Sequence, residues 1–181
     1  LMAMFTMMNH ARADVALQGV AHAARSYDIA HSYAVERLQG RKADGTEANL
    51  ADHADVARML RDIDALALGG RAMAHLACVT MQQGGNRDLV EFLTPVAKVH
   101  CTEAGIRAAE LGVQILGGYG YLQEYRLEQT DRDARITAIY EGTNGIHART
   151  LVSRLLDTPA AEAFEVFVLA EAARHDLASL R

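Results

Sequence analysis

Small and apolar residues recur every three or four positions over long stretches of the chain, and this spacing constrains the fold more than any other feature. In residues 9–38 the recurring positions are Val15, Gly19, Ala23, Tyr27, Ala30, Ala34 and Leu38. A second run covers residues 56–81 in steps of four and three, a spacing that suits helices packed almost parallel to one another. We therefore predict two long helices that pack side by side.

The remaining helices are predicted from their boundary residues. Thr94 is expected to cap a third helix, with Pro95 at its first position, and Gly117-Gly118 to end it. Shorter helices are expected within 124–136 and 144–156, whereas the charged, glycine-containing stretch 40–49 is expected to be a loop. The predicted fold is all-α: an up-and-down four-helix bundle over residues 1–158 with short extra C-terminal helices, the last within 159–181.

Composition and charge exclude several classes of protein. The chain is 50% apolar but only 6% aromatic, which is typical of helices that pack closely through small residues. Its net charge of −5, without a basic cluster, argues against nucleic-acid binding. The apolar start, residues 1–8, is too short to span a membrane, so no membrane insertion is expected. Two distant cysteines without a CxxC motif fit the cytoplasm, and a start at Leu1 suggests a piece of a longer protein.

Most catalytic motifs are absent. No glutamate is followed three residues later by histidine, and there is no HExxH, so no metal site is expected among the eight histidines. For a lone histidine a structural role is the more frequent one. A nucleophile elbow is also missing. The glycines of "GGYGYLQ" (117–123) follow a helix rather than a strand, which argues against a dinucleotide fingerprint. They can end a helix, or let an anionic ligand approach the backbone.

One segment, "IYEGTNGIH" (139–147), places a carboxylate, Glu141, between a tyrosine and a glycine with isoleucines nearby. A glutamate on a solvated surface needs no such setting, whereas one that accepts a proton in a partly dry cleft does. Residue patterns alone leave both interpretations open.

Residues 111–154, "LGVQILGGYGYLQEYRLEQTDRDARITAIYEGTNGIHARTLVSR", closely resemble the C-terminal region of acyl-CoA dehydrogenases. That family is typified by Q-x-x-G-G-x-G-y, then E-Y, R-D-A-(K/R)-I and I-Y-E-G-T-(N/S). Residues 9–41 and 53–60 share the resemblance. It implies that the N-terminal helical and middle β-domains of the family are missing from this chain. Four features resemble a larger, bacterial-type subgroup with an extra C-terminal helical domain: no phenylalanine before Gly40, Ala54 in "HAD", the unusual loop 40–49, and "LTPVAKV". Residues 159–181 are then expected to lead into a further region.

The resemblance implies a reaction in which a glutamate removes the α-proton of an acyl-CoA thioester while the β-hydrogen passes as hydride to FAD. The product is the trans-2-enoyl-CoA. Glu141 matches this base, and its backbone N–H would help polarise the thioester carbonyl. Some members carry the base just before the arginine that matches Arg12, but that position here is Ala11.

Other roles follow from the same motifs. The positions that match cofactor-binding residues of the family are Arg37, Gln114, Gly117, Gly118, Thr143 and Asn144. Those that match substrate-binding residues are Asn9, Arg12, Tyr140 and Gly142. The first four cofactor residues are expected to meet the ADP part of FAD bound mainly by a neighbouring subunit.

The implied partners are acyl-CoA, electron-transfer flavoprotein as electron acceptor, and further copies of the chain in a homodimer or homotetramer. Leu116, Tyr119 and Tyr121 are expected to supply apolar surface for that assembly. Two alternatives remain open: an acyl-CoA oxidase, which reoxidises its flavin differently, and a helical assembly module without catalytic activity. The isolated chain is expected to be inactive.

Overall fold

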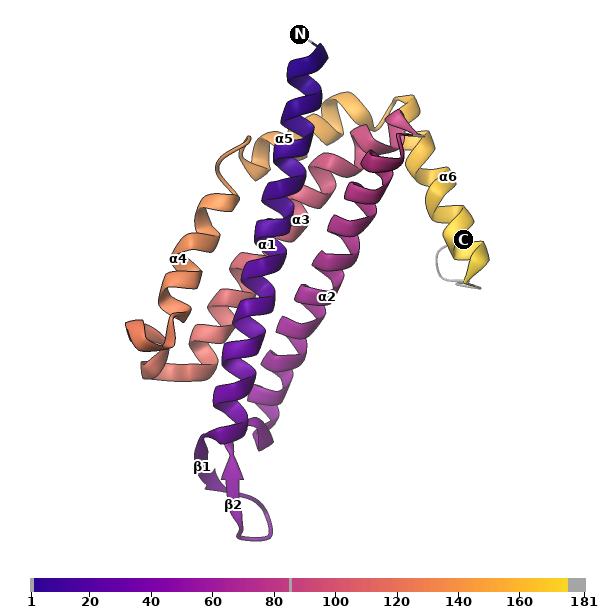
Figure 1. Ribbon diagram of the computed structural model, residues 1–181. Helices are drawn as coiled ribbons and strands as arrows, with labels where there is room; N and C mark the ends of the chain where they lie inside the picture. The colour runs from indigo at the N-terminus through magenta and orange to yellow at the C-terminus, as the bar shows by residue number, and fades with distance from the viewer. Residues whose placement is uncertain (1, 85, 176–181) are drawn as a thin grey trace.

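The computed structural model describes residues 2–84 and 86–175, and its main body is a bundle of four helices. Helices α1 (Met2–Glu36), α2 (Ala54–Gln83), α3 (Arg87–Leu116) and α4 (Leu127–Thr137) run alternately down and up along one long axis (Figure 1). The prediction of an all-α, up-and-down four-helix bundle is confirmed. No helix in the described part of the chain combines the length and apolar character that crossing a membrane requires.

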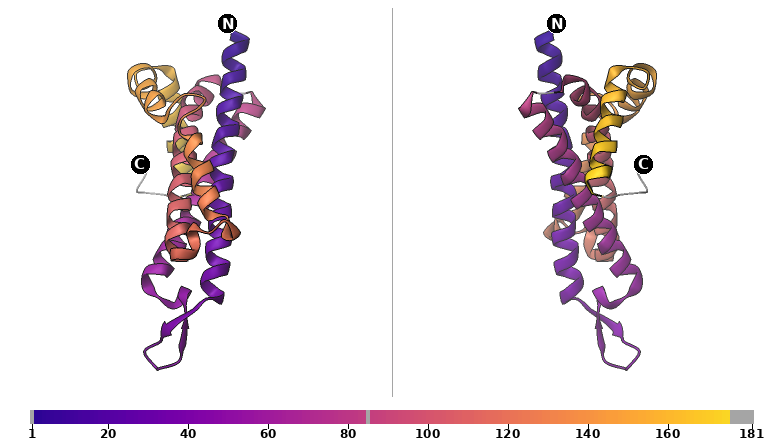
Figure 2. Two further views of the ribbon diagram at one scale, coloured as in Figure 1. Left: turned by 90° about the vertical axis from the view of Figure 1, so that its left-hand side faces the viewer. Right: turned by 90° about the vertical axis from the view of Figure 1, so that its right-hand side faces the viewer.

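Two further helices follow the bundle. Helix α5 (Asn144–Thr150) and a π-helical turn, η4 (Leu151–Leu155), run across the upper end of the bundle, and Figure 2 shows this segment nearly end-on. Helix α6 (Pro159–Arg174) then turns back and packs on the first part of α3, where the rings of Phe92 and Phe164 stack with centroids 4.6 Å apart. Helix α6 begins at Pro159, where the sequence predicts the start of the last helix.

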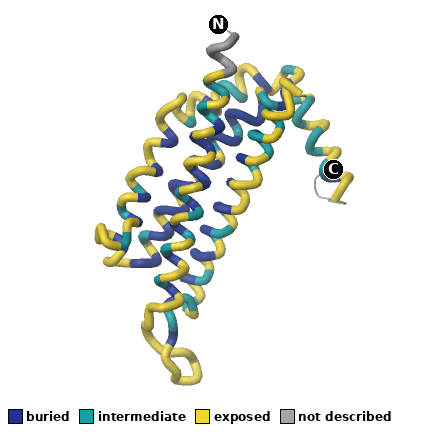
Figure 3. Tube along the Cα trace, viewed as in Figure 1, coloured by how far each residue is buried: buried dark blue, intermediate teal, exposed yellow. Residues whose placement is uncertain are grey.

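The core lies along the inner faces of the long helices, as the dark blue segments of Figure 3 show. Helices α1 and α3 cross at two glycines with their backbones in contact. A Cβ atom on Gly19 would lie 2.2 Å from the carbonyl oxygen of Cys101, and one on Gly105 would lie 2.6 Å from that of Gly19. Buried alanines such as Ala23 and Ala108 continue this contact along both helices. Only residues with little or no side chain allow the two backbones to approach this closely.

The start of α3 corrects one prediction. Thr94 is not the N-cap: the helix begins at Arg87, and the side chain of Asn86 accepts a hydrogen bond from the Leu89 N–H at 3.0 Å. Thr94 and Pro95 lie inside the helix. A proline in a helix interior costs about 3 kcal/mol. Burial of Leu89, Phe92 and Leu93 against α6 and the bundle offsets this cost, since each large apolar side chain contributes about 1.5–3 kcal/mol.

The stretch predicted as a loop contains a short antiparallel hairpin instead. Strands β1 (Leu38–Arg41) and β2 (Glu47–Asn49) pair through Leu38 with Asn49 and Arg41 with Glu47. Asp44 stabilises the turn, because its carboxylate accepts hydrogen bonds from the N–H and hydroxyl of Thr46 at 3.0 and 2.6 Å. Gly45 adopts φ +86°. The pair Asp44-Gly45 is a common hairpin-turn sequence. The loop prediction rested on charge and glycine content and did not use this signal.

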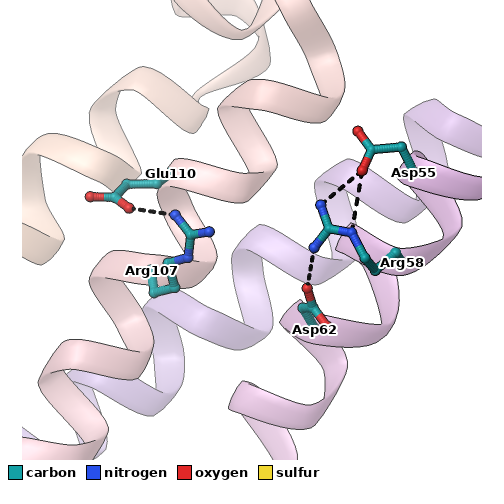
Figure 4. A network of polar contacts seen from close by, with 5 residues as sticks. All are labelled: Asp55, Arg58, Asp62, Arg107 and Glu110. Carbon is teal, nitrogen blue, oxygen red and sulfur yellow. Dashed lines mark hydrogen bonds and ion pairs between the residues drawn. The ribbon is translucent and has the colours of Figure 1, made fainter.

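The outer helix faces carry exposed ion pairs, which Figure 4 shows from close by. Arg58 bridges Asp55 and Asp62 of α2 at 2.8 and 2.7 Å, and Arg107 meets Glu110 of α3 at 3.1 Å. Such solvated pairs one helical turn apart stabilise a helix by only about 0.2–0.5 kcal/mol each. They therefore add little to the fold, whereas the glycine and alanine contacts inside determine how the helices cross.

Candidate functional site

Residues 138–143, which include Glu141, form a loop between α4 and α5. Two adjacent residues in it have positive φ angles, +53° at Glu141 and +93° at Gly142. For a glutamate this left-handed conformation costs about 1–2 kcal/mol. Backbone strain of this kind persists only where the surroundings enforce it, and it is concentrated at functional sites.

Three side chains hold this strained loop by its carbonyl groups. Arg12 of α1 and His147 of α5 donate to the carbonyl oxygen of Glu141 from Nε and Nε2, at 3.4 and 3.0 Å. Lys98 of α3 donates to the carbonyl oxygen of Gly142 from Nζ, at 2.9 Å. The loop is therefore fixed from three different helices.

The carboxylate of Glu141 is exposed, in contrast to its anchored backbone. Among the described residues, that carboxylate takes part in no hydrogen bond or ion pair, and the Glu141 N–H donates to no protein acceptor. The neighbouring Tyr140 is also exposed, and its hydroxyl donates to the amide oxygen of Gln18 on α1. The loop thus presents a carboxylate and a backbone donor to whatever covers this face.

Gly142 cannot carry a side chain in this conformation. Its φ of +93° disfavours any residue other than glycine, and a Cβ atom there would lie 2.9 Å from Nε2 of His147. The imidazole is itself buried and is fixed by its hydrogen bond to Glu141. The glycine after the glutamate is therefore required by the loop geometry of this chain.

Asn144, the first residue of α5, joins the loop to α3. Its side-chain oxygen accepts from Nζ of Lys98 at 2.9 Å, and its amide nitrogen donates to Glu103 at 2.7 Å and to the hydroxyl of Thr102 at 3.1 Å. Thr143 caps the same helix, its hydroxyl oxygen accepting from the Ile146 N–H at 3.3 Å. The side chain of Asn144 thus has protein partners on three residues of one helix.

The predicted substrate residues gather around this loop. Arg12 contacts the Glu141 carbonyl and also donates from NH1 to the side-chain oxygen of Asn9 at 3.3 Å, one turn earlier on α1. Asn9, Arg12, Tyr140, Glu141 and Gly142 thus form one cluster at the junction of α1 with the loop. The fold brings together residues that are about 130 positions apart in the sequence.

Four of the predicted cofactor residues form a second group at the opposite end of the bundle. Arg37 follows α1, and its guanidinium lies 5.6 Å from the ring centroid of Tyr119 in the turn η2 (Gly117–Tyr121). Gln114 is exposed in the last turn of α3, and hypothetical Cβ atoms on Gly117 and Gly118 would meet nothing within 4 Å. This turn leaves its backbone open next to an arginine, an arrangement that suits an anionic ligand.

The two groups are far apart along α3. Lys98 contacts the 138–143 loop, and Leu116 precedes the glycine turn, 18 residues later, which corresponds to roughly 27 Å of helix.

The prediction that Leu116, Tyr119 and Tyr121 supply apolar surface for assembly needs one correction. Leu116 is only 3% exposed and belongs to the core, whereas Tyr119 and Tyr121 are 41% and 80% exposed as expected.

A largely apolar groove of about 550 Å³ lies on another face, between α2, α3 and α5. Its lining includes Leu66, Val96, Val99 and Leu151, and also His147 and Glu103, which bond to the loop and to Asn144. None of the predicted site residues lines this groove. Within residues 2–84 and 86–175, no three His, Cys, Asp or Glu side chains are grouped so that they could hold a metal ion.

Two residues that hold the loop were not predicted as site residues. Lys98 is fully buried on α3, and burial, with the nearby Arg12, lowers its pKa, while Glu103 and Glu141 raise it. His147 is buried too, and burial lowers its pKa most, although its bond to the Glu141 carbonyl acts in the opposite direction. The sequence signal for Lys98 was a charged residue directly after Ala97 and three residues before Cys101, within a helix rich in small apolar residues.

The lowered pKa of His147 predicts an acid dependence of stability. A histidine whose folded pKa lies below its unfolded value, near 6.5, contributes stability that is present above that value. This contribution is lost as the pH falls from about 6.5 towards the folded pKa. We expect His147→Gln in the full-length protein to reduce the decrease of the unfolding midpoint between about pH 7 and pH 5.

The measurement is thermal unfolding of both proteins across that range, with His75→Gln, at an exposed position on α2, as the matched control. His22 supplies a second contribution of the same sign, since burial lowers its pKa as well. Identical pH dependence in the wild type and His147→Gln would contradict the prediction.

Comparisons with known proteins agree on one group. A family profile described as acyl-CoA dehydrogenase, C-terminal domain, matches residues 1–156. The 3-methylmercaptopropionyl-CoA dehydrogenase of Ruegeria pomeroyi is 43% identical over 169 residues, which cover 83% of this chain and 28% of the relative. The structure of butyryl-CoA dehydrogenase from Megasphaera elsdenii superposes with a TM-score of 0.75 at 29% identity, covering 83% of this chain and 37% of that one.

A third similarity is to a chain in a structure described as the electron transferring flavoprotein of Acidaminococcus fermentans. Its TM-score is 0.75 at 26% identity, with 83% of this chain and 37% of that one covered. The chain spans less than two-fifths of the length of each of these three proteins, 28%, 37% and 37%. The same 83% of this chain makes up a smaller share of the Ruegeria relative than of the Megasphaera enzyme, so the Ruegeria relative is the longer protein.

Proposed function

The chain belongs to the acyl-CoA dehydrogenase family as its C-terminal domain, and on this premise we propose that the whole protein oxidises an acyl-CoA thioester to the trans-2-enoyl-CoA. Glu141 is the base in this proposal. The observation that carries it is the strained loop, in which a non-glycine residue at φ +53° is fixed by Arg12, His147 and Lys98 while its carboxylate is unpaired.

The loop geometry suits removal of a proton. The exposed carboxylate accepts the α-proton, and the unpaired N–H of Glu141 donates to the thioester carbonyl, on which negative charge develops. A donor with no protein partner is available for this bond without breaking another. Arg12 and Asn9 lie beside the loop, where they can bind the polar part of the substrate, and Tyr140 lines its acyl part.

FAD, when bound, accepts the β-hydrogen as hydride. The residues present fit an ADP group at the second cluster, where Arg37 stands beside the open turn at Gly117 and Gly118. Gln114 borders the same turn. Thr143 and Asn144 stand next to the base, where their backbone could meet the other end of the cofactor, since the Asn144 side chain bonds to α3. Because roughly 27 Å of α3 separates the two clusters, we assign the ADP-facing cluster to the FAD of a neighbouring subunit.

The assembly and the electron acceptor are part of the proposal. We propose a cytoplasmic homodimer or homotetramer, with exposed Tyr119 and Tyr121 in the subunit contact and electron-transfer flavoprotein as the acceptor. The similarity to a chain from the Acidaminococcus structure supports this acceptor over oxygen. The long Ruegeria relative supports membership in a larger subgroup whose chain continues beyond the bundle.

Flavin content tests the proposal, and it also tests whether FAD binding requires domains other than this bundle. The full-length protein is expected to be purified with about one FAD per chain, since the missing domains supply the walls of the ring site. The 181-residue chain, which offers one arginine and a few backbone donors, is expected to bind FAD more weakly than roughly 10 μM, about −7 kcal/mol.

Absorbance of the purified full-length protein and calorimetric titration of the chain with FAD provide the measurements. A full-length protein that stays colourless after added FAD would favour the assembly module without catalytic activity. Submicromolar, stoichiometric binding by the chain alone would show that the bundle carries the whole cofactor site.

A further inference from the structure

Lys98 is the one charged side chain that is fully buried in the described part of the chain, although the proposed reaction gives it no role. The sequence contains only two lysines, and the other, Lys42, is exposed in the hairpin, where it pairs with Asp52 at 3.0 Å. Burying an ammonium group is costly unless its hydrogen bonds are satisfied. The atoms that accept hydrogen bonds from the Lys98 ammonium group therefore indicate its role.

Both oxygen partners of Lys98 flank the start of α5. Nζ donates at 2.9 Å to the carbonyl of Gly142, the residue after Glu141, and at 2.9 Å to the side-chain oxygen of Asn144. Thr102, one turn later on α3, bonds the Lys98 carbonyl at 2.8 Å and also contacts Asn144. The 30-residue helix α3 thereby holds the chain one and three residues beyond the proposed base.

The remaining loop anchors do not replace this contact. Arg12 and His147 both act on the carbonyl of Glu141, and the Arg12 contact is long at 3.4 Å. The His147 ring also interacts with the Gly142 backbone, but more weakly than with that of Glu141, so Lys98 makes the principal hydrogen bond to the Gly142 carbonyl. Since φ is positive at both Glu141 and Gly142, the bond from Lys98 helps to hold the strained backbone that directly follows the base.

Stability alone does not explain a lysine at this position. A methionine would avoid the cost of burying an ammonium group, which offsets the cost of about 1–3 kcal/mol for each oxygen acceptor left without its donor. What a methionine cannot supply is a donor to two oxygens at fixed positions.

Resting on the proposed function, we infer that Lys98 is a positioning residue for Glu141: its bonds to the Gly142 carbonyl and the Asn144 side chain hold the base in its reactive orientation. Lys98 touches neither substrate nor FAD in this assignment. Its loss therefore lowers kcat and leaves the binding of acyl-CoA and FAD almost unchanged.

The test compares Lys98→Met with the matched control Lys42→Met in the full-length flavoprotein. Misplacing a catalytic group by about 1 Å costs up to about 100-fold in rate. We expect kcat for Lys98→Met to fall by roughly 10- to 100-fold, with KM within about twofold and the flavin content unchanged. Lys42→Met is expected to match the wild type.

A double-mutant cycle with Glu141→Gln separates positioning from a general structural role. If Lys98 acts through Glu141, adding Lys98→Met to Glu141→Gln leaves the residual rate unchanged. An equal loss in both backgrounds, or a loss of flavin, would overturn the inference. Unchanged kcat for Lys98→Met alongside an inactive Glu141→Gln would overturn it too, while leaving the proposed function intact.

The proposed function fails by a different outcome, namely Glu141→Gln turning over like the wild type, and the inference falls with it. Should Lys98→Met not fold, Lys98→Gln provides the second variant, with a shorter, uncharged donor. It is expected to lose kcat in the same way, and wild-type turnover in that variant would equally overturn the inference.

Discussion

Replacing Glu141 by glutamine in the full-length protein is expected to lower acyl-CoA dehydrogenation by about 100- to 10,000-fold. Glutamine keeps the size and shape of the side chain but cannot accept the α-proton. The loop depends on backbone carbonyls held by Arg12, His147 and Lys98, none of which touches the carboxylate. Binding of FAD and acyl-CoA should therefore persist while kcat is lost.

Steady-state turnover with an artificial electron acceptor, together with the flavin spectrum and acyl-CoA titration, measures both halves of this expectation. Glu110→Gln is the matched control, because Glu110 is an exposed α3 glutamate whose carboxylate pairs with Arg107 (Figure 4). The control should behave as the wild type. Near-normal turnover of Glu141→Gln would remove the base assignment.

A single methyl group at Gly19 is expected to destabilise the bundle by about 3 kcal/mol or more. Overpacking a core commonly costs about 1–3 kcal/mol because side chains can rearrange. At this crossing the added Cβ would meet backbone atoms, the Cys101 carbonyl carbon and oxygen at 2.5 and 2.2 Å, so relief requires α1 and α3 to separate. The base loop would also be affected, since Arg12 and Lys98 reach it from these two helices.

Gly69→Ala provides the matched control for Gly19→Ala. Gly69 is an exposed glycine inside α2, and a Cβ there would approach only His100, at 4.0 Å. In a helix, alanine at such a site is favoured over glycine by about 0.5–1 kcal/mol. Chemical denaturation should therefore separate the two variants by several kcal/mol. Equal stabilities would mean that α1 and α3 do not cross in contact at Gly19.

The fold was largely predictable because helical spacing reports which face of each helix is buried. The second predicted helix, residues 56–81, shows this: its recurring apolar residues include Val56, Leu60 and Ile63, and all three are buried in the bundle. The errors lie at boundaries. Thr94-Pro95 has the local chemistry of a helix start, but burial of Phe92 and Leu93 extends α3 back to Arg87. Local preference was weaker than tertiary packing at that point.

The site was predictable only in part, for physical reasons that differ between residues. Glu141 and Gly142 stand in a motif whose chemistry can be argued from residue types. Lys98 and His147 are 43 and 6 residues from Glu141, and their function depends on which carbonyl groups the folded chain brings to them. Periodicity can mark Lys98 as a charge on a buried face, but it cannot identify the Gly142 carbonyl as its partner.

The separation of the two predicted clusters was likewise not visible in the sequence. Gln114 and Glu141 are close along the chain, yet α4 carries the chain back along the bundle between them (Figure 1). An antiparallel helix of 11 residues places the base at one end and the glycine turn at the other. This geometry is why we assign the turn to the cofactor of a neighbouring subunit.

The most direct test of the central claim is an anaerobic single turnover of the full-length flavoprotein with an acyl-CoA panel. With no electron acceptor present, the wild type is predicted to bleach its flavin with at least one thioester and to form one enoyl-CoA per flavin reduced. Under the same conditions Glu141→Gln should bind the thioester and stay yellow. Bleaching of that variant at the wild-type rate, or a wild type that no acyl-CoA reduces, would contradict the account.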